Sequence, residues 1–466
     1  MNKKAAAQRL CNHPPTWQTR SGQLNYYIYS RMKHLPSVIL LLVIFTGCKH
    51  SKYKEPQFGP RDIHQVIEKM TDIMIHDVTN PPLAARFFSY ACLAGYEVVV
   101  QNDSAFKSMH GLLNQYPPIA KPDTIYGYSY QLAALIAMME TAKKLQPSGK
   151  LLEEYEKQFI DSCALSGFDK VVITASEKYA VYISKLILAY AKSDAYNRIS
   201  NYPRYTPIEK EGSWYPTPPA YFTAVEPYFN KVRPFTLDSA SQFKPDAPVP
   251  YSKQKNSPFY KLMLENYKDT LSDEHRMIAA FWDCNPFAVQ DNGHLLVGLK
   301  KISPGAHWMG ISGFACKKAH KGFSQSMKIF TVVAMGLMDS FICCWDEKYR
   351  SNRIRPETAI RKYIDADWKP LLQTPPFPEY LSGHSTISAS SAQILTFYFG
   401  DNFPYTDSSE IRFGLPPRNF TSFKQAADEA AISRFYGGIH FMDAIINGSR
   451  QGRSVGNLLL EKIEKK

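Results

Sequence analysis

The sequence lacks several features that would place it quickly in a functional class. Its basic residues are scattered, with no run of five or more, although the formal net charge is +13. Nucleic-acid-binding faces usually cluster such residues, so this distribution argues against one. No apolar run reaches the roughly 18 residues that a membrane-spanning helix needs. A P-loop, a dinucleotide-binding glycine fingerprint and an HExxH motif are also absent, so none of these motifs indicates nucleotide binding or zinc proteolysis.

Cysteine is scarce and widely spaced. Beyond Cys11 and Cys48 six cysteines remain, and none forms a CxxC pair, so the spacing gives no support for a structural zinc site. Most of the six lie in apolar segments of helical pattern, where a buried thiol is expected. The neighbouring Cys343 and Cys344 are poorly placed to bridge each other inside a helix. In an exported protein some of the six could pair, so the sequence leaves the disulfides open.

An export signal follows Met32. A short basic start leads into an apolar run over Val38–Phe45, which is too short to span a bilayer but suits a signal peptide. Phe45-Thr46-Gly47-Cys48 resembles a bacterial lipobox, in which the cysteine becomes the lipidated first residue of the mature protein. We therefore expect an exported lipoprotein, anchored by lipid at Cys48 in the periplasm or on the outer membrane.

This reading divides the chain into segments. Residues 1–31 would be an upstream extension outside the protein proper, 32–47 the lipoprotein signal peptide and 48–60 a polar tether. Residues 1–47 hold six basic and no acidic residues, which leaves 49 basic and 42 acidic residues, or +7. We expect an N-terminal helical region over 61–257 and a catalytic helical bundle over 258–466.

Apolar residues recur at intervals of three and four along most of the chain, the period of an amphipathic helix. This pattern predicts helices over Asp62–Val78, Pro82–Val100, Tyr126–Leu145, Glu177–Ala191, Leu262–Phe287, Phe323–Lys348, His384–Phe399, Ser422–Gly437 and Phe441–Ile463. Residues 201–257 are too rich in proline for regular helix and too aromatic for a simple linker. We read them as an ordered excursion packed on the surface, with a wall of a substrate cleft as the alternative. The fold class is all-α, a helical bundle.

Three separated segments carry the residues that suggest chemistry. In the first, Lys348 and Arg355 stand seven apart after a long apolar helix, where a helix dipole alone could explain the lysine. In the second, Ser382-Gly383-His384 opens a helix, whose first amides form a ready anion site, although serine is also a common N-cap. In the third, Arg434 and His440 flank a pair of glycines that would permit close approach of the backbone to a ligand.

Together the segments supply two guanidinium forks, an ammonium, hydroxyl and amide donors, and two histidines. Arginine suits tetrahedral oxyanions because its planar fork can bind two oxygens at once. The three-part pattern Lys-x6-Arg-Pro, Ser-Gly-His and Ser-Arg-x5-His, in this order over residues 345–443, resembles the signature of the superfamily of type 2 phosphatidic acid phosphatases and vanadium-dependent haloperoxidases.

The resemblance implies roles for these residues. Phosphate or vanadate would be held by Lys348, Arg355, Ser382, Gly383 and Arg434. His440 would be the axial ligand of vanadium or the nucleophile that forms a phosphohistidine, and His384 would be the acid–base residue.

The chain departs from the family pattern at two positions. Leu381 replaces the usual proline before Ser-Gly-His. The final aspartate, usually four residues after the axial histidine, is here Asp443, three after His440, with Ala444 at the usual position. Because positions three and four share a helix face, we still expect Asp443 to orient His440.

Several features favour a haloperoxidase. The chain lacks the spanning helices of the membrane phosphatases, and about two hundred further residues of helical pattern precede the bundle. Trp345 and Phe377 stand where the chain resembles vanadium chloroperoxidases and bacterial iodoperoxidases, so we expect both to line the pocket, with core packing as the plain alternative. The reaction implied is oxidation of a halide, iodide among the candidates, by hydrogen peroxide at a histidine-bound vanadate, with Lys348 polarising the peroxide.

Two other functions stay open. A phosphatase would use the same residues on phosphate monoesters, with His440 attacking phosphorus, His384 protonating the leaving alcohol and no resident cofactor. A lipoprotein that only binds an oxyanion would need the cations but has no use for two histidines, which argues against it.

Overall fold

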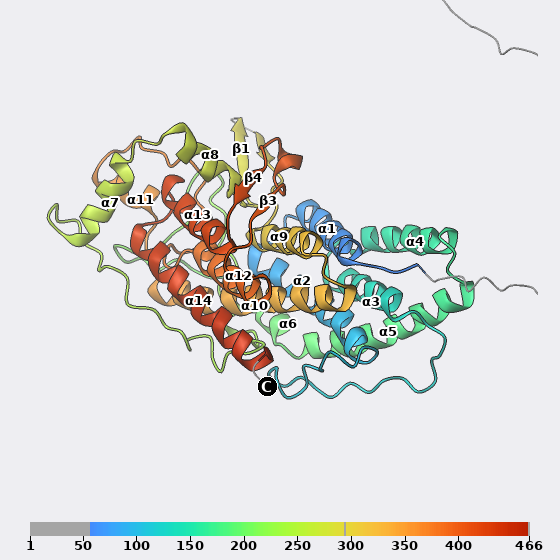
Figure 1. Cartoon of the computed structure of the whole chain (residues 1–466). Coiled ribbons are helices and arrows are strands. Elements are labelled where there is room, and N and C mark those ends of the chain that lie inside the picture. The colour runs from blue at the N-terminus through green and yellow to red at the C-terminus, as the bar shows by residue number, and fades with distance from the viewer. Residues whose placement is uncertain (1–55, 293–294, 465–466) are drawn as a thin grey trace, which may run out of the picture. The chain divides into compact units, whose positions relative to one another are not determined.

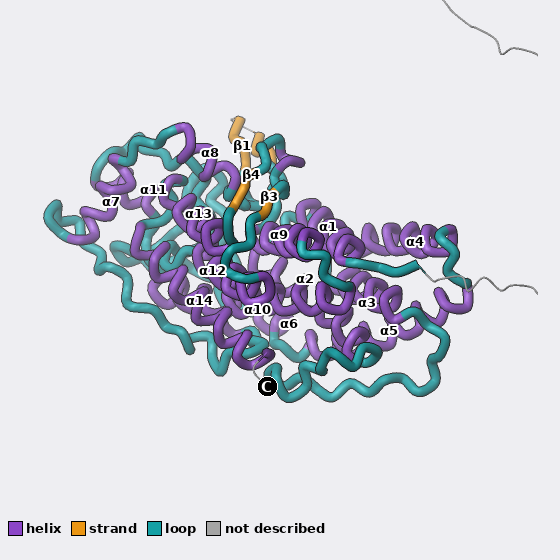
Figure 2. Tube along the Cα trace, in the orientation of Figure 1, coloured by secondary structure: helices purple, strands orange, loops and turns teal. Residues whose placement is uncertain are grey.

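The computed structural model describes residues 56–292 and 295–464. The predicted signal peptide and lipobox lie outside these residues. Lys54–Lys466 form one compact unit. Helices and loops make up nearly all of the described chain (Figure 2), which confirms the all-α prediction.

The first part of the chain contains five long helices and a short one. They are α1 (Pro60–His76), α2 (Pro81–Val100), α3 (Tyr130–Leu145), α4 (Gly149–Leu165), α5 (Lys170–Lys192) and α6 (Tyr196–Ile199). Between residues 201 and 257 the described structure has only the 3-10 turn η1 (Phe229–Lys231), as the density of proline predicts. This excursion accepts hydrogen bonds from Trp345 and Tyr349 at the carbonyl of Val225. None of the described residues that line the candidate site belongs to residues 201–257. The segment therefore packs on the protein, and the described structure does not show it as a wall of the cleft.

The second part contains the bundle that carries the site. Its helices are α7 (Pro258–Lys268), α8 (Asp273–Phe281), α9 (Pro304–Lys318), α10 (Phe323–Ser351), α11 (Pro356–Tyr363), α12 (Gly383–Phe399), η2 (Ile411–Phe413), α13 (Phe423–Tyr436) and α14 (Met442–Glu464). Two antiparallel hairpins interrupt it, β1 (Val289–Asn292) with β2 (Leu295–Gly298) and β3 (Tyr405–Asp407) with β4 (Arg418–Phe420). The single helix predicted over 262–287 is wrong: it breaks into α7 and α8, because Ser272 caps a new helix by accepting from the amide of His275.

The helix α12 lies inside the bundle, against α9, α10, α13 and α14 (Figure 1). Its sequence is rich in serine, alanine and threonine, and this small surface lets α14 approach closely. A Cβ at Gly452 of α14 would lie 1.9 Å from the carbonyl oxygen of Thr386, so only glycine fits there. The close contact of these two helices fixes the start of α12 next to the start of α14.

The long helix α10 packs between the two parts of the chain, with α2 on one side and α12 on another. Both α2 and α10 are long and apolar enough to cross a membrane by length and composition, and 89% and 94% of their apolar windows are buried inside the protein. Residues from both sides of position 257 share one core. The division at 257/258 stays a prediction.

Candidate active site

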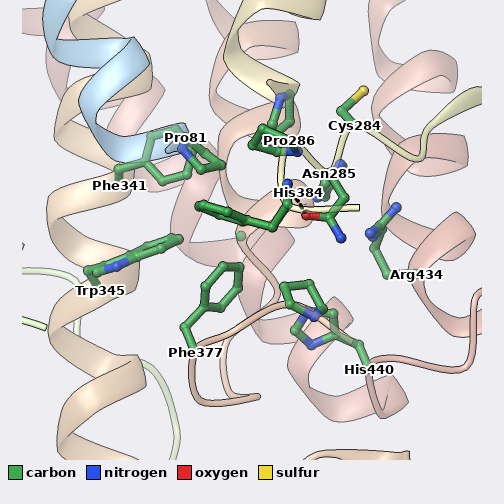
Figure 3. A pocket seen from close by; sticks show the side chains of 14 residues that line it. Pro81, Cys284, Asn285, Pro286, Phe341, Trp345, Phe377, His384, Arg434 and His440 are labelled. Atoms are coloured by element: carbon green, nitrogen blue, oxygen red, sulfur yellow. Dashed lines mark hydrogen bonds between the residues drawn. The ribbon is translucent and has the colours of Figure 1, made fainter. Parts of the chain in front are cut away.

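The three segments singled out in the sequence meet at one cavity. It lies among the end of α10, the start of α12 and the loop between α13 and α14. His384, Arg434 and His440 line its polar side, and Trp345 and Phe377 line its apolar side, as Figure 3 shows. Lining residues that the sequence did not suggest include Pro81, Asn285, Pro286 and Phe341. They come from the start of α2, the loop after α8 and the middle of α10, and no motif marks them.

Two fully buried arginines have no carboxylate within hydrogen-bond distance in the described structure: Arg434, which lines the cavity, and Arg355, which bonds to His440 of the cavity wall. Arg355 is 0% exposed and donates to the carbonyls of Phe377 and Ile439, both at 2.9 Å. Arg434 is 1% exposed and donates to the carbonyl of Trp282 at 2.9 Å. The Nη2 of Arg355 and the Nε of Arg434 are buried with no hydrogen-bond partner. Burial lowers the pKa of both groups, and an anion between them would offset that cost.

The neighbours of His440 define its tautomer. Its Nδ1 lies 2.9 Å from Oε1 of Glu379, and its Nε2 lies 3.1 Å from Nη1 of Arg355. Since a guanidinium can only donate, Nε2 must be the acceptor and Nδ1 must carry the hydrogen. Burial, and then the charges of Arg355 and Lys348, lower the pKa of His440 well below its ordinary value. The residue therefore presents a neutral Nε2 lone pair, as a metal ligand or a nucleophile requires.

The second histidine, His384, has a free nitrogen of its own. It forms a hydrogen bond to the backbone of Trp282, and its Nε2 is buried without a partner. Burial, and then the charge of Arg434, lower its pKa well below the ordinary value. A neutral imidazole with one unpartnered nitrogen at the cavity can accept a proton and return it.

Ser382 and Gly383 form the start of α12. The Ser382 side chain caps this helix by accepting from the amide of Ser385, so the plain N-cap reading holds for its oxygen. Gly383 and His384 line the cavity. The positive end of a 17-residue helix therefore opens onto the same space as the two arginines.

The predicted oxyanion ligand Lys348 is held by the backbone. Its Nζ donates to the carbonyls of Pro378, Glu379 and Leu381, and it is fully buried. Burial lowers its pKa to about 7, whereas three carbonyl acceptors favour the ammonium form. The lysine thus fixes the loop that leads into Ser382, and its direct contact with an anion stays a prediction.

The expectation that Asp443 orients His440 is wrong. His440 lies before the first residue of α14, so the two residues do not share a helix face. Asp443 instead binds both terminal nitrogens of Arg353, one of them at 2.7 Å. Arg353 also pairs with Glu379, and Glu379 holds Nδ1 of His440. The orienting residue is Glu379, which lies in the segment before Ser-Gly-His and was not assigned a role from the sequence.

The glycine pair before His440 serves packing within the protein. A Cβ at Gly437 would lie 2.7 Å from the side chain of Leu372, and Gly438 has a φ of +71° and lies against Pro370. The close approach is thus to the 368–372 segment, which corrects the expectation of an approach to a ligand.

Comparison with known proteins agrees with this site. A family model described as "VCPO second helical-bundle domain" matches residues 328–466, which contain all three segments. A search of curated protein sequences found no match. Two solved structures of a bacterial vanadium-dependent chloroperoxidase, holo and apo, share the fold, with TM-scores of 0.60 and 0.62 at 15% identity. They cover 88% and 83% of this chain and 93% and 95% of their own.

A third solved structure is much more similar in sequence. It is described as the first bacterial vanadium-dependent iodoperoxidase, and it is 43% identical to this chain with a TM-score of 0.82. The match covers 88% of this chain and 99% of that one. With the three-part motif gathered at one cavity, this similarity shows that the chain belongs to the vanadium-dependent haloperoxidase family.

Proposed function

We propose that this haloperoxidase oxidises iodide with hydrogen peroxide, and that its vanadate is held on Nε2 of His440. The observation that carries the proposal is a group of buried polar atoms with no hydrogen-bond partner in the described structure. In the described structure, Nε of Arg434 and Nε2 of His384 are buried without a partner at the cavity, and so is Nη2 of Arg355, whose guanidinium bonds to His440 of the cavity wall. Two guanidinium nitrogens and an imidazole nitrogen grouped in this way fit the oxygens of a bound oxyanion.

The donor set fits vanadate. The two guanidinium groups and the start of α12 would bind its oxygens. His440 would hold the metal through Nε2, which accepts from Nη1 of Arg355 in this structure and would exchange that hydrogen bond for the metal. Glu379 fixes the orientation of that imidazole from behind, as carboxylates commonly do for metal-bound histidines. Bound vanadate supplies a Lewis acid that activates hydrogen peroxide toward a halide.

The protein's own part in the reaction is positioning and proton transfer. The overall reaction, X⁻ + H2O2 + H⁺ giving HOX + H2O, takes two electrons from the halide and consumes one proton. His384 Nε2 has no protein partner, so it is free to hold that proton at the cavity and release it. Lys348 and Glu379 hold the loop and the imidazole in place. Trp345 and Phe377 form the apolar wall on which a large, weakly hydrated halide would rest.

Iodide is proposed as the halide on similarity. The bacterial iodoperoxidase is 43% identical over nearly its whole length, whereas the chloroperoxidase structures are 15% identical and show the fold alone. A test is to assay triiodide formation, bromination and chlorination by metal-free protein before and after adding vanadate. We expect activity with iodide only after vanadate is added, weaker or no activity with bromide and chloride, and loss of activity when excess phosphate competes.

The same assay addresses the phosphatase alternative. His440→Ala should abolish vanadate-dependent activity because it removes the Nε2 nitrogen that would hold vanadate beside Arg355. His384→Ala should still bind vanadate but turn over slowly. If the metal-free protein instead hydrolyses a phosphate monoester, is inhibited by vanadate and never oxidises iodide, the proposal fails and the phosphatase function replaces it.

We also propose that the enzyme is exported and anchored by lipid at Cys48. The support is the order of basic start, apolar run and Gly47-Cys48 in the sequence. Changing Cys48 to Ser in the full chain should move the protein from the membrane fraction to the soluble fraction. Unchanged membrane association, or a cytoplasmic location of the native protein, would contradict the proposal.

A further inference from the structure

A second group of buried side chains lies beside the cavity, and the reaction described above does not use it. It consists of Cys284 after α8, His307 in α9 and Glu410 just before η2. The Sγ of Cys284 and an Oε1 of Glu410 each lie 3.4 Å from the same atom, Nδ1 of His307. The three atoms lie within 4.8 Å of one another, and all three residues are buried.

These distances match the edges of a tetrahedral metal site. With bonds of about 2.3 Å to sulfur and about 2.0 Å to nitrogen or oxygen, a tetrahedral angle places S and N about 3.5 Å apart and N and O about 3.3 Å apart. Both observed distances from Nδ1 lie within a few tenths of an ångström of these values. Around Nδ1 of His307 the spacing is therefore that of a metal site, and the Sγ of Cys284 and the Oε1 of Glu410 lie within 4.8 Å of each other.

The second ring nitrogen of His307, Nε2, contacts a carboxylate, as is common for histidines that bind metal. Its Nε2 lies 2.7 Å from Oδ2 of Asp407, which also accepts from the amide of Ser409 at 2.9 Å. A carboxylate in this position holds a hydrogen on Nε2, which leaves Nδ1 as the nitrogen that faces Cys284 and Glu410. This second contact selects the nitrogen that a metal would need.

Hydrogen bonds within the described structure do not satisfy every buried polar atom of this group. If His307 were protonated, the single hydrogen on Nδ1 could serve Cys284 or Glu410 but not both, and Oε1 of Glu410 has no hydrogen-bond partner. Oδ1 of the neighbouring Asp283 is also buried without one. A dication would occupy all three atoms and offset the charges of a thiolate and a carboxylate.

We propose that Cys284, His307 and Glu410 bind one divalent ion of the zinc class. Thiolate, imidazole and carboxylate together suit zinc, whereas magnesium and calcium prefer oxygen ligands alone. On binding, the Cys284 thiol loses its proton to solvent and forms the S–metal bond. Three protein ligands leave a fourth position for water. Because Cys284, Asn285 and Pro286 line the cavity, the ion would tie that wall to α9 and to the 407–410 segment.

The test is direct binding of metal to the full chain after removal of all metals. Cobalt(II) is the probe, since a thiolate ligand gives it a strong near-ultraviolet charge-transfer band, and zinc should then displace it at one ion per chain. Cys284→Ser should remove the band, and Glu410→Gln should weaken binding at least about tenfold. Cys316→Ser is the matched control, because Cys316 is equally buried and lies on α9 but outside the group.

The measurement is independent of the vanadate site. His440→Ala should bind cobalt and zinc as the unchanged chain does, because His440 is not a member of the group. A wild-type chain that shows no charge-transfer band and retains no zinc would overturn the proposal and leave a hydrogen-bonded group centred on His307. A charge-transfer band that persists in Cys284→Ser would also overturn the proposal. This result can be interpreted even if Glu410→Gln fails to fold.

Discussion

Two kinds of buried arginine occur in this protein, and their partners differ. Arg86 in α2 is 4% exposed and pairs with Asp194, at 2.7 Å from Nε and 3.3 Å from Nη2. Arg355 and Arg434 are buried more deeply, yet in the described structure they bond only carbonyls and a histidine. A buried charge normally has its counterion in the protein. An arginine that bonds a carboxylate of the chain is structural, and one that donates only to carbonyls and a histidine is available to bind an anion from outside.

The largest expected effect tests the structural arginine. Arg86→Met should lower the free energy of unfolding by about 3–5 kcal/mol, because it leaves the buried carboxylate of Asp194 unpaired. Chemical denaturation measures this loss. Vanadate affinity of the folded protein should not change. Adding Asp194→Asn to the same chain should recover part of the stability, and a stable single variant would mean that the pair is not what holds α2 to the end of α5.

Arg355→Met should lower the activity and leave the stability intact, the reverse of Arg86→Met. We expect vanadate-dependent iodide oxidation to fall by about 10²–10³-fold, the usual loss when one charged donor is removed from a reacting oxyanion. Without any anion the stability should be unchanged or higher, since an uncompensated buried charge has been replaced by an apolar side chain. Steady-state rates with saturating vanadate and denaturation in anion-free buffer measure the two quantities. A loss of stability as large as that of Arg86→Met would contradict the distinction between the two arginines.

The sequence was sufficient to predict the fold class and the meeting of the three motif segments at one cavity. The helical period is local, and the motif residues are recognisable by their type and spacing. The orienting contact was missed because it depends on the position of His440 outside α14, which spacing alone does not reveal. The metal group was missed for a related reason, since positions 284, 307 and 410 are far apart in the chain and form no short motif. Contacts between distant segments follow from packing, and a single sequence records them poorly.

Glu379→Gln tests how the protein positions His440 for vanadate binding. The glutamine keeps the shape but removes the carboxylate that holds Nδ1 of His440, so we expect vanadate binding to weaken by about 10–100-fold. Arg353 would keep its pair with Asp443, so the stability in anion-free buffer should change much less than in Arg86→Met. Equilibrium dialysis against vanadate at several pH values separates this role from plain structural support, because a positioning role should shift the pH dependence of binding. Asp443→Asn is the control and should weaken binding less.

The smallest effect is a pH-dependent stabilisation by an inert anion. Burial, followed by the charges of Arg434 for His384 and of Arg355 for His440, lowers the pKa of both histidines in the folded protein. In the unfolded chain they titrate near about 6.5, so below that pH the unfolded state binds more protons and the folded state loses stability.

An anion in the cage favours protonated histidine, so it should restore stability most at low pH. Sulfate is the suitable probe, because it is tetrahedral and stays a dianion between pH 5.5 and 8. At about ten times its dissociation constant it should add about 1.4 kcal/mol, which raises Tm by about 1.5 °C for a chain of this size. Thermal denaturation of metal-free protein with and without sulfate should therefore show a shift that grows as pH falls. The shift should vanish in Arg355→Met and persist in Asp443→Asn. A Tm shift of equal size at every pH would mean that the arginines account for all of the anion binding. Protonation of the two histidines would then make no contribution to it.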